Sequence, residues 1–521
     1  MAALWRRARL GFQPDLLQNP RFFSSGLSRT DAAATADEDE ARGSLAVSGD
    51  DLRSRIFRLR HPKRSATAAL ERWVSEGRQV SASELRLIAR DLKRSQRYKH
   101  ALEIFTWMES LSTFNISATD HATKLELITK VQTVAEAEMY FEKIRDSASR
   151  KAACFPLLHS YVKERDLEKA ETFMAKLQSL GLLVNPHLFN EMMKLYMATG
   201  YFEKVFSVIQ HMKRNKFPLN VLSYNLWMNA CAKLSGVALV EMVYKEMVTD
   251  KNVEVGWSSY CTLANFYTTS GFYDKALTAL RMAEQKLSMK NRLAYSFIMT
   301  NYSALNNRDG VLRLWESSKR VPGRITCVNY ICVMLCLLKV GDFEEVEKIF
   351  RSWERECRKY DIRVSNVLLG AYVRNGRMDK AEALHHHTLE RGGVPNYKTW
   401  EILMEGWVKT KQMDKAVEAM KKGFCLLKFC VWRPAAETVM AIMNYFEEQG
   451  SVENAKEYVK VLRRLRLMTL PLYKSFLRVH IQAGRAAPDI PKMMERDRIE
   501  MDEESTALIE CMCKINSAEV P

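Results

Sequence analysis

The stretch PHLFNEMMKLYMATGYFEKVFSVIQHMKRNKFPLN, residues 186–220, decides the fold. Its first half carries an apolar stripe with the i, i+3, i+4, i+7 spacing of one helix face: Phe189, Met192, Met193 and Tyr196. Gly200 follows, where glycine commonly ends a helix. A second stripe comes next, made of Val205, Val208, Ile209 and Met212, and Pro218 closes the segment. These residues predict two helices joined by a short turn.

The same pattern returns about every 35 residues. The aromatic residue at its start recurs as Phe189, Tyr224, Tyr260, Tyr295, Tyr330 and Trp400, and the one skipped position is polar Ser365. A unit of this length cannot bury its own apolar face, so neighbouring units must stack into an extended array. The sequence therefore predicts an all-α solenoid, a class that binds long partners along one surface.

Counting the aromatic residue as position 4 gives a register for the whole chain. The units are 186–220, 221–256, 257–291, 292–326, 327–361, 362–396 and 397–435, with weaker units at about 82–117, 118–150 and 151–185, another at 436–469 and a partial one from 470. Glycine recurs between the two helices, and a small or β-branched residue recurs five positions later. We expect these residues and the position-4 aromatics to serve packing.

Charge is distributed unevenly along the chain. The net charge is +17, residues 1–30 carry +4, residues 31–51 carry −6 and residues 486–521 carry −5, which leaves +24 on residues 52–485. A basic folded body with acidic flanks favours a polyanionic partner. A solvated basic surface, or adaptation to an organelle, would give the same composition.

The N-terminal residues 1–30 have the character of a mitochondrial transit peptide. They contain Arg6, Arg7, Arg9, Arg21 and Arg29 with a single acid and no long apolar core. We expect import into the matrix and cleavage near Phe23/Ser24; a disordered basic tail is the alternative. The remaining expected regions are an acidic disordered linker at 31–51, an N-terminal capping helical region at 52–81, the repeat array at 82–485, and an acidic C-terminal tail or cap at 486–521.

Membrane and redox signals are missing from the sequence. No stretch of 18 uncharged apolar residues occurs, so no transmembrane helix is expected. The eleven cysteines show no paired spacing and are interpreted as reduced thiols, most of them in the core.

Two helical repeats fit a period near 35, and position 8 separates them. The tetratricopeptide repeat needs a small residue there, whereas this chain has Met193, Met228, Ala264, Met299, Met334, Leu369 and Met404. The inter-helix glycine, Pro395-Asn396, Pro218-Leu219-Asn220 and the segments 97–103 and 368–372 instead resemble plant mitochondrial pentatricopeptide repeat proteins of the pure-repeat P class. The resemblance covers nearly all of 82–485 and implies a right-handed superhelix of about ten to twelve helix-turn-helix repeats.

The resemblance implies that the fifth and last residues of each unit face one RNA base. The pairs are Asn190 with Asn220, Asn225 with Gly256, Cys261 with Asn291, Ser296 with Thr326, Ile331 with Asp361, and Asn366 with Asn396. Amides carry a donor and an acceptor and can read base edges, and Asn–Asn pairs in this family favour pyrimidines. We therefore expect C or U about five nucleotides apart. The alternative is that Asn185, Asn220, Asn291, Asp361 and Asn396 are helix N-caps.

Two further positions bear on RNA. The second position, an aliphatic wedge between bases in the family, is kept as Leu222, Leu293 and Val328 but departs at His187, Ser258, Arg363 and Lys398. Position 13 carries a positively charged residue in seven units, and a row of cations at this spacing suits an RNA phosphate backbone. These residues are Arg94, Lys130, Lys163, Lys233, Lys339, Arg374 and Lys409. Cations complementing the helix dipole would give the same pattern. Phe155, Ile331, Glu401 and Met440 fit the fifth position poorly.

No catalytic or cofactor motif is found. His385, His386 and His387 are adjacent and would point about 100° apart on a helix, so they are not expected to share a metal. Cys332 and Cys336 lack further ligands, Cys511 and Cys513 do not form the spacing of a zinc deaminase, and no phosphate-binding glycine loop occurs. We expect neither enzyme activity, nor a cofactor, nor a small-molecule substrate.

The leading hypothesis is an adaptor that binds single-stranded mitochondrial RNA, one base per repeat, and acts in transcript stability, processing, splicing or translation. RNA-processing factors are expected as further partners. A helical scaffold for proteins, including one associated with the mitoribosome, is the alternative, and the irregular second and fifth positions favour it.

Overall fold

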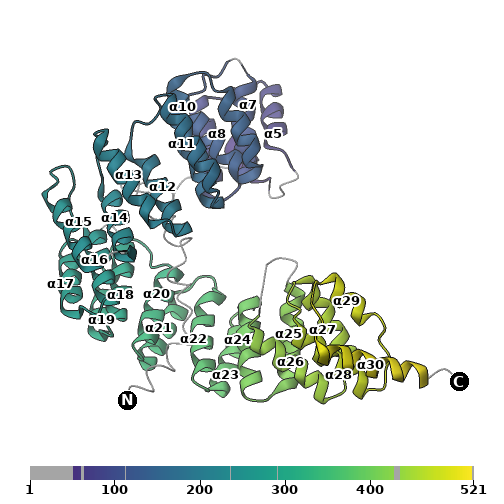
Figure 1. Ribbon diagram of the computed structural model, residues 1–521. Helices are drawn as coiled ribbons and strands as arrows, with labels where there is room; N and C mark the ends of the chain where they lie inside the picture. The colour runs from purple at the N-terminus through teal and green to yellow at the C-terminus, as the bar shows by residue number, and fades with distance from the viewer. Residues whose placement is uncertain are drawn as a thin grey trace. The chain divides into compact units, whose positions relative to one another are not determined.

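The computed structural model describes residues 51–59, 64–111, 113–234, 236–289, 292–426 and 434–518. Within these residues the chain forms 27 helices and no strand (Figure 1). This confirms the predicted all-α helical-repeat class. The chain divides into two compact units, residues 1–290 and residues 291–521. The predicted transit peptide, its cleavage site and all but the last residue of the acidic linker lie outside the described residues.

In its described residues, the first unit contains two short helices and then six helix pairs. Its helices are α4 (Leu52–Phe57), α5 (Ala66–Ser75), α6 (Ala82–Arg94), α7 (Tyr98–Ser110), α8 (Ala118–Val131), α9 (Val134–Lys143), α10 (Ser147–Glu164), α11 (Leu167–Ser179), α12 (Pro186–Thr199), α13 (Phe202–Arg214), α14 (Val221–Leu234), α15 (Val237–Thr249), α16 (Trp257–Thr269) and α17 (Tyr273–Gln285). From α8 to α16, the first helices of successive pairs pack against one another.

The described part of the second unit contains six more pairs and a final helix. Its helices are α18 (Arg292–Ala304), α19 (Arg308–Lys319), α20 (Cys327–Lys339), α21 (Phe343–Glu356), α22 (Ile362–Arg374), α23 (Met378–Glu390), α24 (Tyr397–Lys409), α25 (Met413–Cys425), α26 (Ala436–Glu448), α27 (Val452–Arg464), α28 (Leu470–Gln482), α29 (Ile490–Arg496) and α30 (Glu503–Ala518). First helices again form a continuous layer, which runs from α18 to α28 and ends on α30.

The α8–α9 turn is extended, since Gln132 has φ −117°, but the turn inside most of the other pairs has one common backbone conformation. Its central residue has positive φ, from 58° at Gly450 to 83° at Gly341, a region that costs other residues about 1 kcal/mol or more. The same place in four other pairs is nevertheless occupied by Gln96, Arg165, Asn306 and Lys411, with φ between 55° and 60°. Packing of the two helices therefore imposes the turn even where the residue does not favour it.

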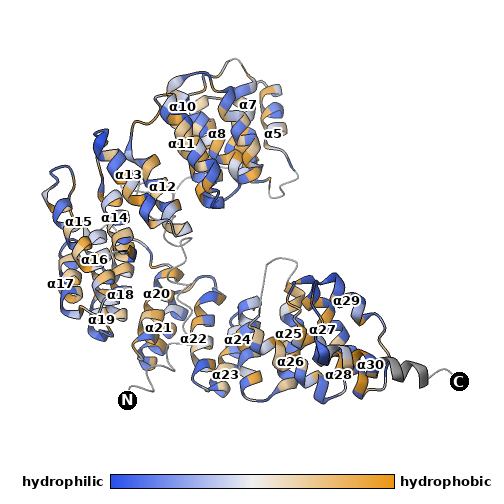
Figure 2. Cartoon of the chain, in the orientation of Figure 1, coloured by the Kyte–Doolittle hydropathy of each residue, from blue (hydrophilic) through white to orange (hydrophobic). Residues whose placement is uncertain are grey.

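The core of each pair follows the repeat register. The small or β-branched residue of each second helix is fully buried: Ala101, Ala137, Ala170, Val205, Val240, Ala276, Val311, Val346, Ala381, Ala416 and Ala455 all have 0% exposure. A short side chain here lets the two helix axes approach. The helices carry both apolar and polar residues along their length (Figure 2), as expected for an array that is buried only where helices meet.

Ser365 occupies the position-4 site that lacks an aromatic ring. Its hydroxyl donates to the Tyr360 hydroxyl at 2.8 Å, and the Tyr360 ring packs edge-on against Trp353 at 5.0 Å between centroids. The aromatic group therefore comes from the preceding linker, five residues earlier in the chain. A strict period of 35 could not reveal this substitution.

Helix α10 begins earlier than the repeat register predicts. Its first residue is Ser147, whereas the corresponding unit was expected to start at about residue 151. The Asp146 carboxylate accepts the backbone N–H of Ser149 at 2.8 Å and so caps an additional turn. Pro156 lies inside this helix, and it removes one intrahelical N–H donor.

Successive pairs are joined by a recurring polar contact that we call the Lys–Glu bracket. A glutamate on one second helix accepts a hydrogen bond from a tyrosine of the next first helix and an ion pair from a lysine of the next second helix. The glutamate, tyrosine and lysine are Glu138, Tyr161 and Lys169; Glu171, Tyr196 and Lys204; Glu241, Tyr267 and Lys275; and Glu347, Tyr372 and Lys380. A fifth bracket uses Trp407 with Glu382 and Lys415.

Candidate nucleic-acid interface

A closed ring of hydrogen bonds joins α12 to the start of α14. Asn190 donates from Nδ2 to Oδ1 of Asn220 at 3.1 Å, and Ser223 donates from Oγ to Oδ1 of Asn190 at 2.8 Å. The Ser223 backbone N–H also donates to Oδ1 of Asn220 at 3.0 Å. We call these three residues the first amide triad. Asn190 is 1% exposed and Ser223 is fully buried, while Asn220 is half-buried.

The second Asn–Asn pair forms the same ring between α22 and α24. Asn366 donates from Nδ2 to Oδ1 of Asn396 at 3.2 Å, and Thr399 donates from Oγ1 to Oδ1 of Asn366 at 2.9 Å. The Thr399 backbone N–H donates to Oδ1 of Asn396 at 3.1 Å. Asn366, Asn396 and Thr399 form the second amide triad, with the residues at the same register positions as in the first.

The triads leave one polar group open at each junction. Oδ1 of Asn220 accepts from Nδ2 of Asn190 and from the Ser223 backbone N–H, and the Ser223 hydroxyl also lies 3.1 Å away. Oδ1 of Asn396 has the corresponding three neighbours in the second triad. Their Nδ2 groups have no hydrogen-bond acceptor among the described residues. Each last-position asparagine therefore caps a helix with its oxygen and presents two N–H donors with its nitrogen. N-capping and base contact can be served by different atoms of one side chain.

The hydroxyl members of the triads were not expected from the sequence. Ser223 and Thr399 each lie three residues after the last-position asparagine, where an N-cap receives its backbone hydrogen bond. An Asn-x-x-Ser/Thr pattern at a unit boundary is the signal that could have identified them.

The other expected base-reading residues have different surroundings. Asn225 donates to Oγ of Ser258 at 3.4 Å, but its Oδ1 and the hydroxyl of Ser259 are buried without a partner, because Gly256 supplies no side chain there. Asp361 caps α22 and is bound on both oxygens by the guanidinium of Arg363, with N–O distances of 2.6 to 3.2 Å. Ser296 is half-buried. Asn291 lies outside the described residues.

The three expected wedge residues differ in exposure. Leu293 is 41% exposed and Val328 is 43% exposed, whereas Leu222 is half-buried. Each is the second residue of its unit and lies in the first turn of its helix. Large apolar side chains left in water at this position can contact the flat face of a base.

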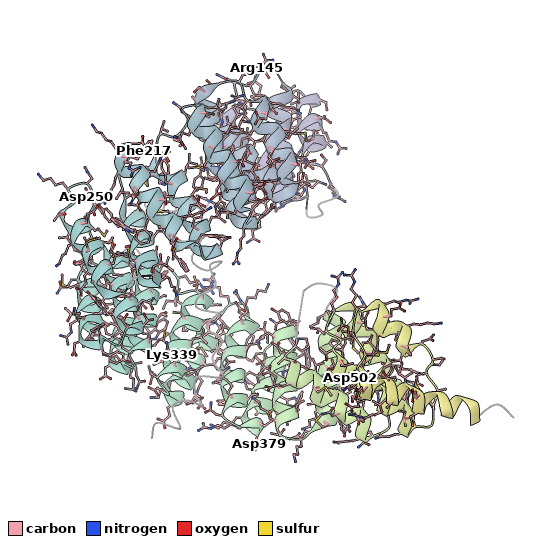
Figure 3. The ribbon with its side chains drawn as sticks, viewed as in Figure 1. Arg145, Phe217, Asp250, Lys339, Asp379 and Asp502 are labelled. Atoms are coloured by element: carbon pink, nitrogen blue, oxygen red, sulfur yellow. The ribbon has the colours of Figure 1, made fainter. Side chains whose placement is uncertain are left out.

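All seven cations expected at position 13 are exposed at the surface, near the C-terminal ends of first helices. Lys339, for example, is the last residue of α20 (Figure 3). Lys130 pairs with Glu126 at 2.5 Å and lies 4.7 Å above the Tyr98 ring, and Arg94 lies 3.7 Å from Asp91. Lys163, Lys233, Lys339 and Lys409 make no ion pair within the described part of the chain. Desolvation by neighbouring protein lowers the pKa of Lys339.

The histidine run and the paired cysteines have ordinary structural surroundings. His385 is buried and packs edge-on against Trp400, while Nε2 of His387 contacts Oε1 of Glu354 at 3.0 Å. The hydroxyl of Thr300 lies 3.9 Å from the sulfurs of both Cys332 and Cys336. The described residues hold no cluster of three or more potential metal ligands, and none of their helices is long and apolar enough to cross a membrane.

Comparison with known proteins agrees with this architecture. The pentatricopeptide repeat domain family matches residues 172–233, and the PPR repeat family matches residues 222–251 and 364–393. Pentatricopeptide repeat-containing protein At5g27460 of Arabidopsis thaliana is 52% identical over 483 residues, which are 92% of this chain and 98% of that protein. The mitochondrial relative At4g02820 of the same plant is 32% identical, over 98% of this chain and 97% of its own length.

Solved structures show a more distant similarity. The pentatricopeptide repeat protein PPR10, crystallised in complex with an 18-nt psaJ RNA element, is 14% identical over 90% of this chain and 84% of that one, with a TM-score of 0.39. The sequence relationship to the plant proteins is far stronger. The chain belongs to the pentatricopeptide repeat family.

Proposed function

We propose that this protein is a sequence-selective adaptor for single-stranded RNA that acts on mitochondrial transcripts and reads one base per helix pair. The observation that carries the proposal is the recurrence of the amide triad at two junctions, with two asparagines and one hydroxyl residue in the same register. In each triad a buried asparagine holds a second asparagine so that only N–H donors are presented. RNA-binding repeat arrays are known to read one base per repeat with two or three side chains.

The atoms left open by the triads favour a particular base edge. Nδ2 of Asn220 and Nδ2 of Asn396 can only donate, and both pyrimidines carry the O2 acceptor at the edge of the ring. Cytosine adds N3 and uracil adds O4 as further acceptors. Purine edges also carry acceptors, such as adenine N1 and guanine O6, so the proposal that the two triads select C or U rests on the family preference for Asn–Asn pairs, with which these donors are compatible.

Cations and apolar residues complete the proposed RNA path. The seven position-13 residues would contact phosphates, and those without protein partners, such as Lys163, Lys233 and Lys409, can do so without breaking an ion pair. Leu222, Leu293 and Val328 would contact base faces. Asn225, Asn291, Ser296 and Asp361 are proposed as weaker readers, since none of them is known to belong to a complete triad. Occupancy would protect or remodel a transcript, and no covalent step is required.

Mitochondrial action is supported by the relatives. Several of them, including At4g21705 and At2g20710 of Arabidopsis thaliana, are named as mitochondrial proteins. The arginine-rich residues 1–30 fit an import signal. We therefore place the protein in mitochondria, with the matrix and cleavage near Phe23/Ser24 as the finer proposal.

A substitution that keeps the helix cap but removes the donors tests the base-reading role. Serine is as good an N-cap as asparagine, so Asn220→Ser and Asn396→Ser should keep the helix cap. Each change also removes the acceptor of the buried Nδ2 of Asn190 or Asn366, so the free energy of unfolding should fall by about 1–3 kcal/mol while the chain stays folded. Both should lower affinity for oligocytidylate and oligouridylate, measured by fluorescence anisotropy, and should reduce the preference over oligoadenylate. Unchanged affinity and preference would show that these asparagines are caps alone.

Asn185 offers a matched control. It caps α12 by accepting the His187 backbone N–H at 3.0 Å, but its register partner is Phe155, so no amide triad forms. Asn185→Ser should leave RNA affinity at the native value. Absence of RNA binding by the native full chain, at low and at physiological salt, would remove the proposal altogether.

A second candidate, a helical scaffold associated with the mitoribosome, is favoured by the apolar residues at some fifth positions. Ile331 and Met440 cannot hydrogen-bond a base edge. Crosslinking in isolated mitochondria followed by sequencing of the bound RNA distinguishes the two functions. A sharp footprint on few transcripts supports the adaptor, whereas reads confined to rRNA, with ribosomal proteins in the purified sample, support the scaffold.

A further inference from the structure

The junction between α28 and α30 has the register of an amide triad but a different chemistry. Lys474 is the fifth residue of its helix unit, where Asn190 and Asn366 stand in theirs. Asp502 precedes α30 as Asn220 precedes α14, and Ser505 follows three residues later as Ser223 does. The Ser505 backbone N–H donates to Oδ1 of Asp502 at 2.9 Å, which reproduces the capping bond of the triads.

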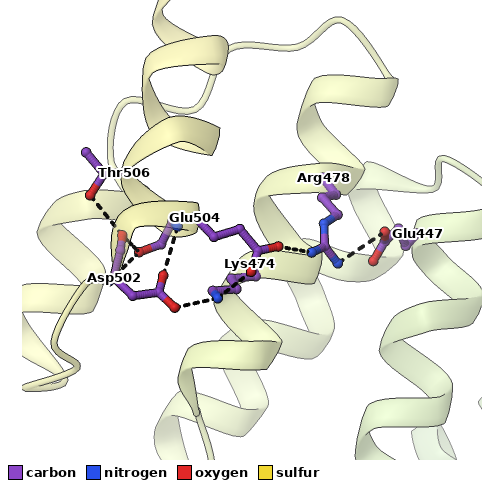
Figure 4. Close-up of polar contacts among 7 residues, drawn as sticks. Glu447, Lys474, Arg478, Asp502, Glu504 and Thr506 are labelled. Carbon is purple, nitrogen blue, oxygen red and sulfur yellow. Dashed lines mark hydrogen bonds and ion pairs between the residues drawn. The ribbon is translucent and has the colours of Figure 1, made fainter.

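An ion-pair network replaces the asparagine pair at this junction (Figure 4). Nζ of Lys474 donates to Oδ2 of Asp502 and to Oε2 of Glu504, both at 2.6 Å. One turn further along α28, Arg478 pairs with Glu504 and lies 3.8 Å from Glu447. We call these residues the closed junction. The Lys474 side chain is only 15% exposed, although it is a lysine on the layer of first helices.

The carboxylates of α30 occupy positions that phosphate oxygens would otherwise take. Asp502 and Glu504 bind two cations of α28 with charge-assisted hydrogen bonds, and residues 486–521 carry a net charge of −5. The hydrogen bond from Lys474 lowers the pKa of Asp502 to about 2, so the carboxylate is ionised at neutral pH. An incoming polyanion would meet carboxylate oxygens here instead of amide donors.

The first junction of the array has a similar composition, which is an independent observation. Arg86 is the fifth residue of the unit that begins at α6, and it binds both oxygens of Asp120 near the start of α8, at 3.0 Å from Nε and 2.7 Å from Nη2. The side chain of Asp120 is 4% exposed. A cation at position 5 neutralised by the next helix thus occurs at the first junction and at the last one, whereas both amide triads lie between them in the sequence.

We infer that the closed junction is an end stop, at which the acidic helix α30 neutralises a cationic fifth position and prevents single-stranded RNA from extending past α26. This inference rests on the proposed RNA-binding function and adds the position at which the RNA-binding surface ends. The partner that the closed junction excludes is the phosphate backbone, through competition for Lys474 and Arg478. The chain would consequently contact fewer nucleotides than it has helix pairs.

Removing the two carboxylates tests the end stop. The variant Asp502→Asn/Glu504→Gln keeps side-chain size, and asparagine keeps the N-cap of α30. Full-length native and variant chains are titrated with oligocytidylate and oligouridylate that lengthen one nucleotide at a time. The shortest RNA that reaches full affinity should become about one nucleotide longer, and the slope of log K against log salt should steepen by roughly 0.7 for each cation that is freed.

Glu453→Gln/Glu457→Gln is the matched control. Both residues are exposed on α27, and Glu453 pairs with Arg485 at 2.9 Å, so the net charge changes equally away from the junction. Circular dichroism and thermal melting of each variant establish that α30 remains folded. If the two double variants show the same RNA length requirement and the same salt slope, the end stop is wrong.

Lys474→Gln supplies the second readout. In the native chain the inference expects no change in RNA affinity, because the lysine is already neutralised. In the Asp502→Asn/Glu504→Gln chain, Lys474→Gln should reverse the increase in RNA length requirement and the steeper salt slope. A weakened native affinity with Lys474→Gln would show that RNA already uses this lysine and would overturn the inference. Failure of the native chain to bind any of the oligonucleotides would instead overturn the proposed function.

Discussion

The first amide triad and the closed junction have one geometry and two chemistries. In both, a fifth-position side chain reaches the residue that caps the next first helix, and a serine three residues later donates its backbone N–H to that cap. At α12–α14 the pair is neutral and leaves N–H donors open. At α28–α30 it is ionic and shows carboxylates to solvent. The backbone fixes where each junction lies, and two side chains decide whether it presents N–H donors or carboxylates.

The largest expected effect is on stability, and it follows from the buried hydroxyl of the second triad. Thr399→Val keeps the shape but removes the donor to Oδ1 of Asn366, which is 8% exposed and would be left unpaired. An unsatisfied buried acceptor costs about 1–3 kcal/mol. Chemical denaturation should show a loss in this range.

At the closed junction the equivalent change should cost less. The hydroxyl of Ser505 accepts the Asp502 backbone N–H and donates to the Asp502 backbone oxygen, both at 2.9 Å, so Ser505→Ala leaves no buried side-chain acceptor unpaired. Equal losses for Thr399→Val and Ser505→Ala would contradict the distinction between the two kinds of junction.

The next effect is on RNA affinity and comes from converting an open junction into a closed one. Asn366→Lys combined with Asn396→Asp should place an ion pair where the second triad stands. Loss of the N–H donors and gain of a carboxylate should lower affinity for oligocytidylate about tenfold, which corresponds to about 1.4 kcal/mol. Fluorescence anisotropy measures the change.

Its control is the same exchange in the first triad, Asn190→Lys with Asn220→Asp. Melting temperatures verify that both chains remain folded. The two exchanges should act alike because the two triads share their contacts. Native affinity in both would show that neither triad touches RNA.

A smaller effect is expected from a Lys–Glu bracket. Glu347→Gln removes the charge that joins Lys380 and Tyr372 across two helix pairs. Exposed ion pairs contribute about 0.2–1 kcal/mol, so the free energy of unfolding should fall by this amount at low salt and by less at high salt. Glu316→Gln is the control, because its partner Lys319 lies in the same helix; an equal, salt-independent loss in both would contradict the bracket's role.

The smallest effect is a difference in pH dependence between the two kinds of junction. The triads contain no titratable group. Lys474 lowers the pKa of Asp502 to about 2, below the unfolded value of about 3.9. The contribution of Asp502 to stability is therefore complete above the unfolded pKa and is lost as pH falls through the folded one.

Melting curves of the native chain and Asp502→Asn between about pH 5 and pH 2 should converge as the solution becomes acidic. The Asn396→Ser chain should keep a constant offset from the native chain over the same range. If the melting temperatures of the native chain and the Asn396→Ser chain also converge, the acid destabilises the structure at a site other than the closed junction.

Sequence alone was sufficient for the features that depend on local pattern. The spacing from Phe189 to Trp400 predicts the helix pairs, and the register places Asn190 with Asn220 and Asn366 with Asn396. The Lys–Glu brackets were missed because each combines three positions in two units, and five of the junctions that the structure describes carry all three. The early start of α10 was missed because a single cap, Asp146, overrides the period. The ion pairs of Lys474 could not be predicted, because Asp502 and Glu504 lie 28 and 30 residues later, in the acidic C-terminal segment.

The Lys–Glu brackets have a mechanical consequence. An array that reads one base per helix pair would need an even spacing between pairs, because small deviations in that spacing would add up along the array. The brackets add ionic contacts between successive pairs, whereas the α12-to-α14 junction is held by the neutral first amide triad and by the ion pair of Lys213 with Glu246. Because the bracket contacts are ionic and partly exposed, added salt weakens them. Concentrated salt should therefore loosen the brackets more than it loosens the neutral hydrogen bonds of the first amide triad.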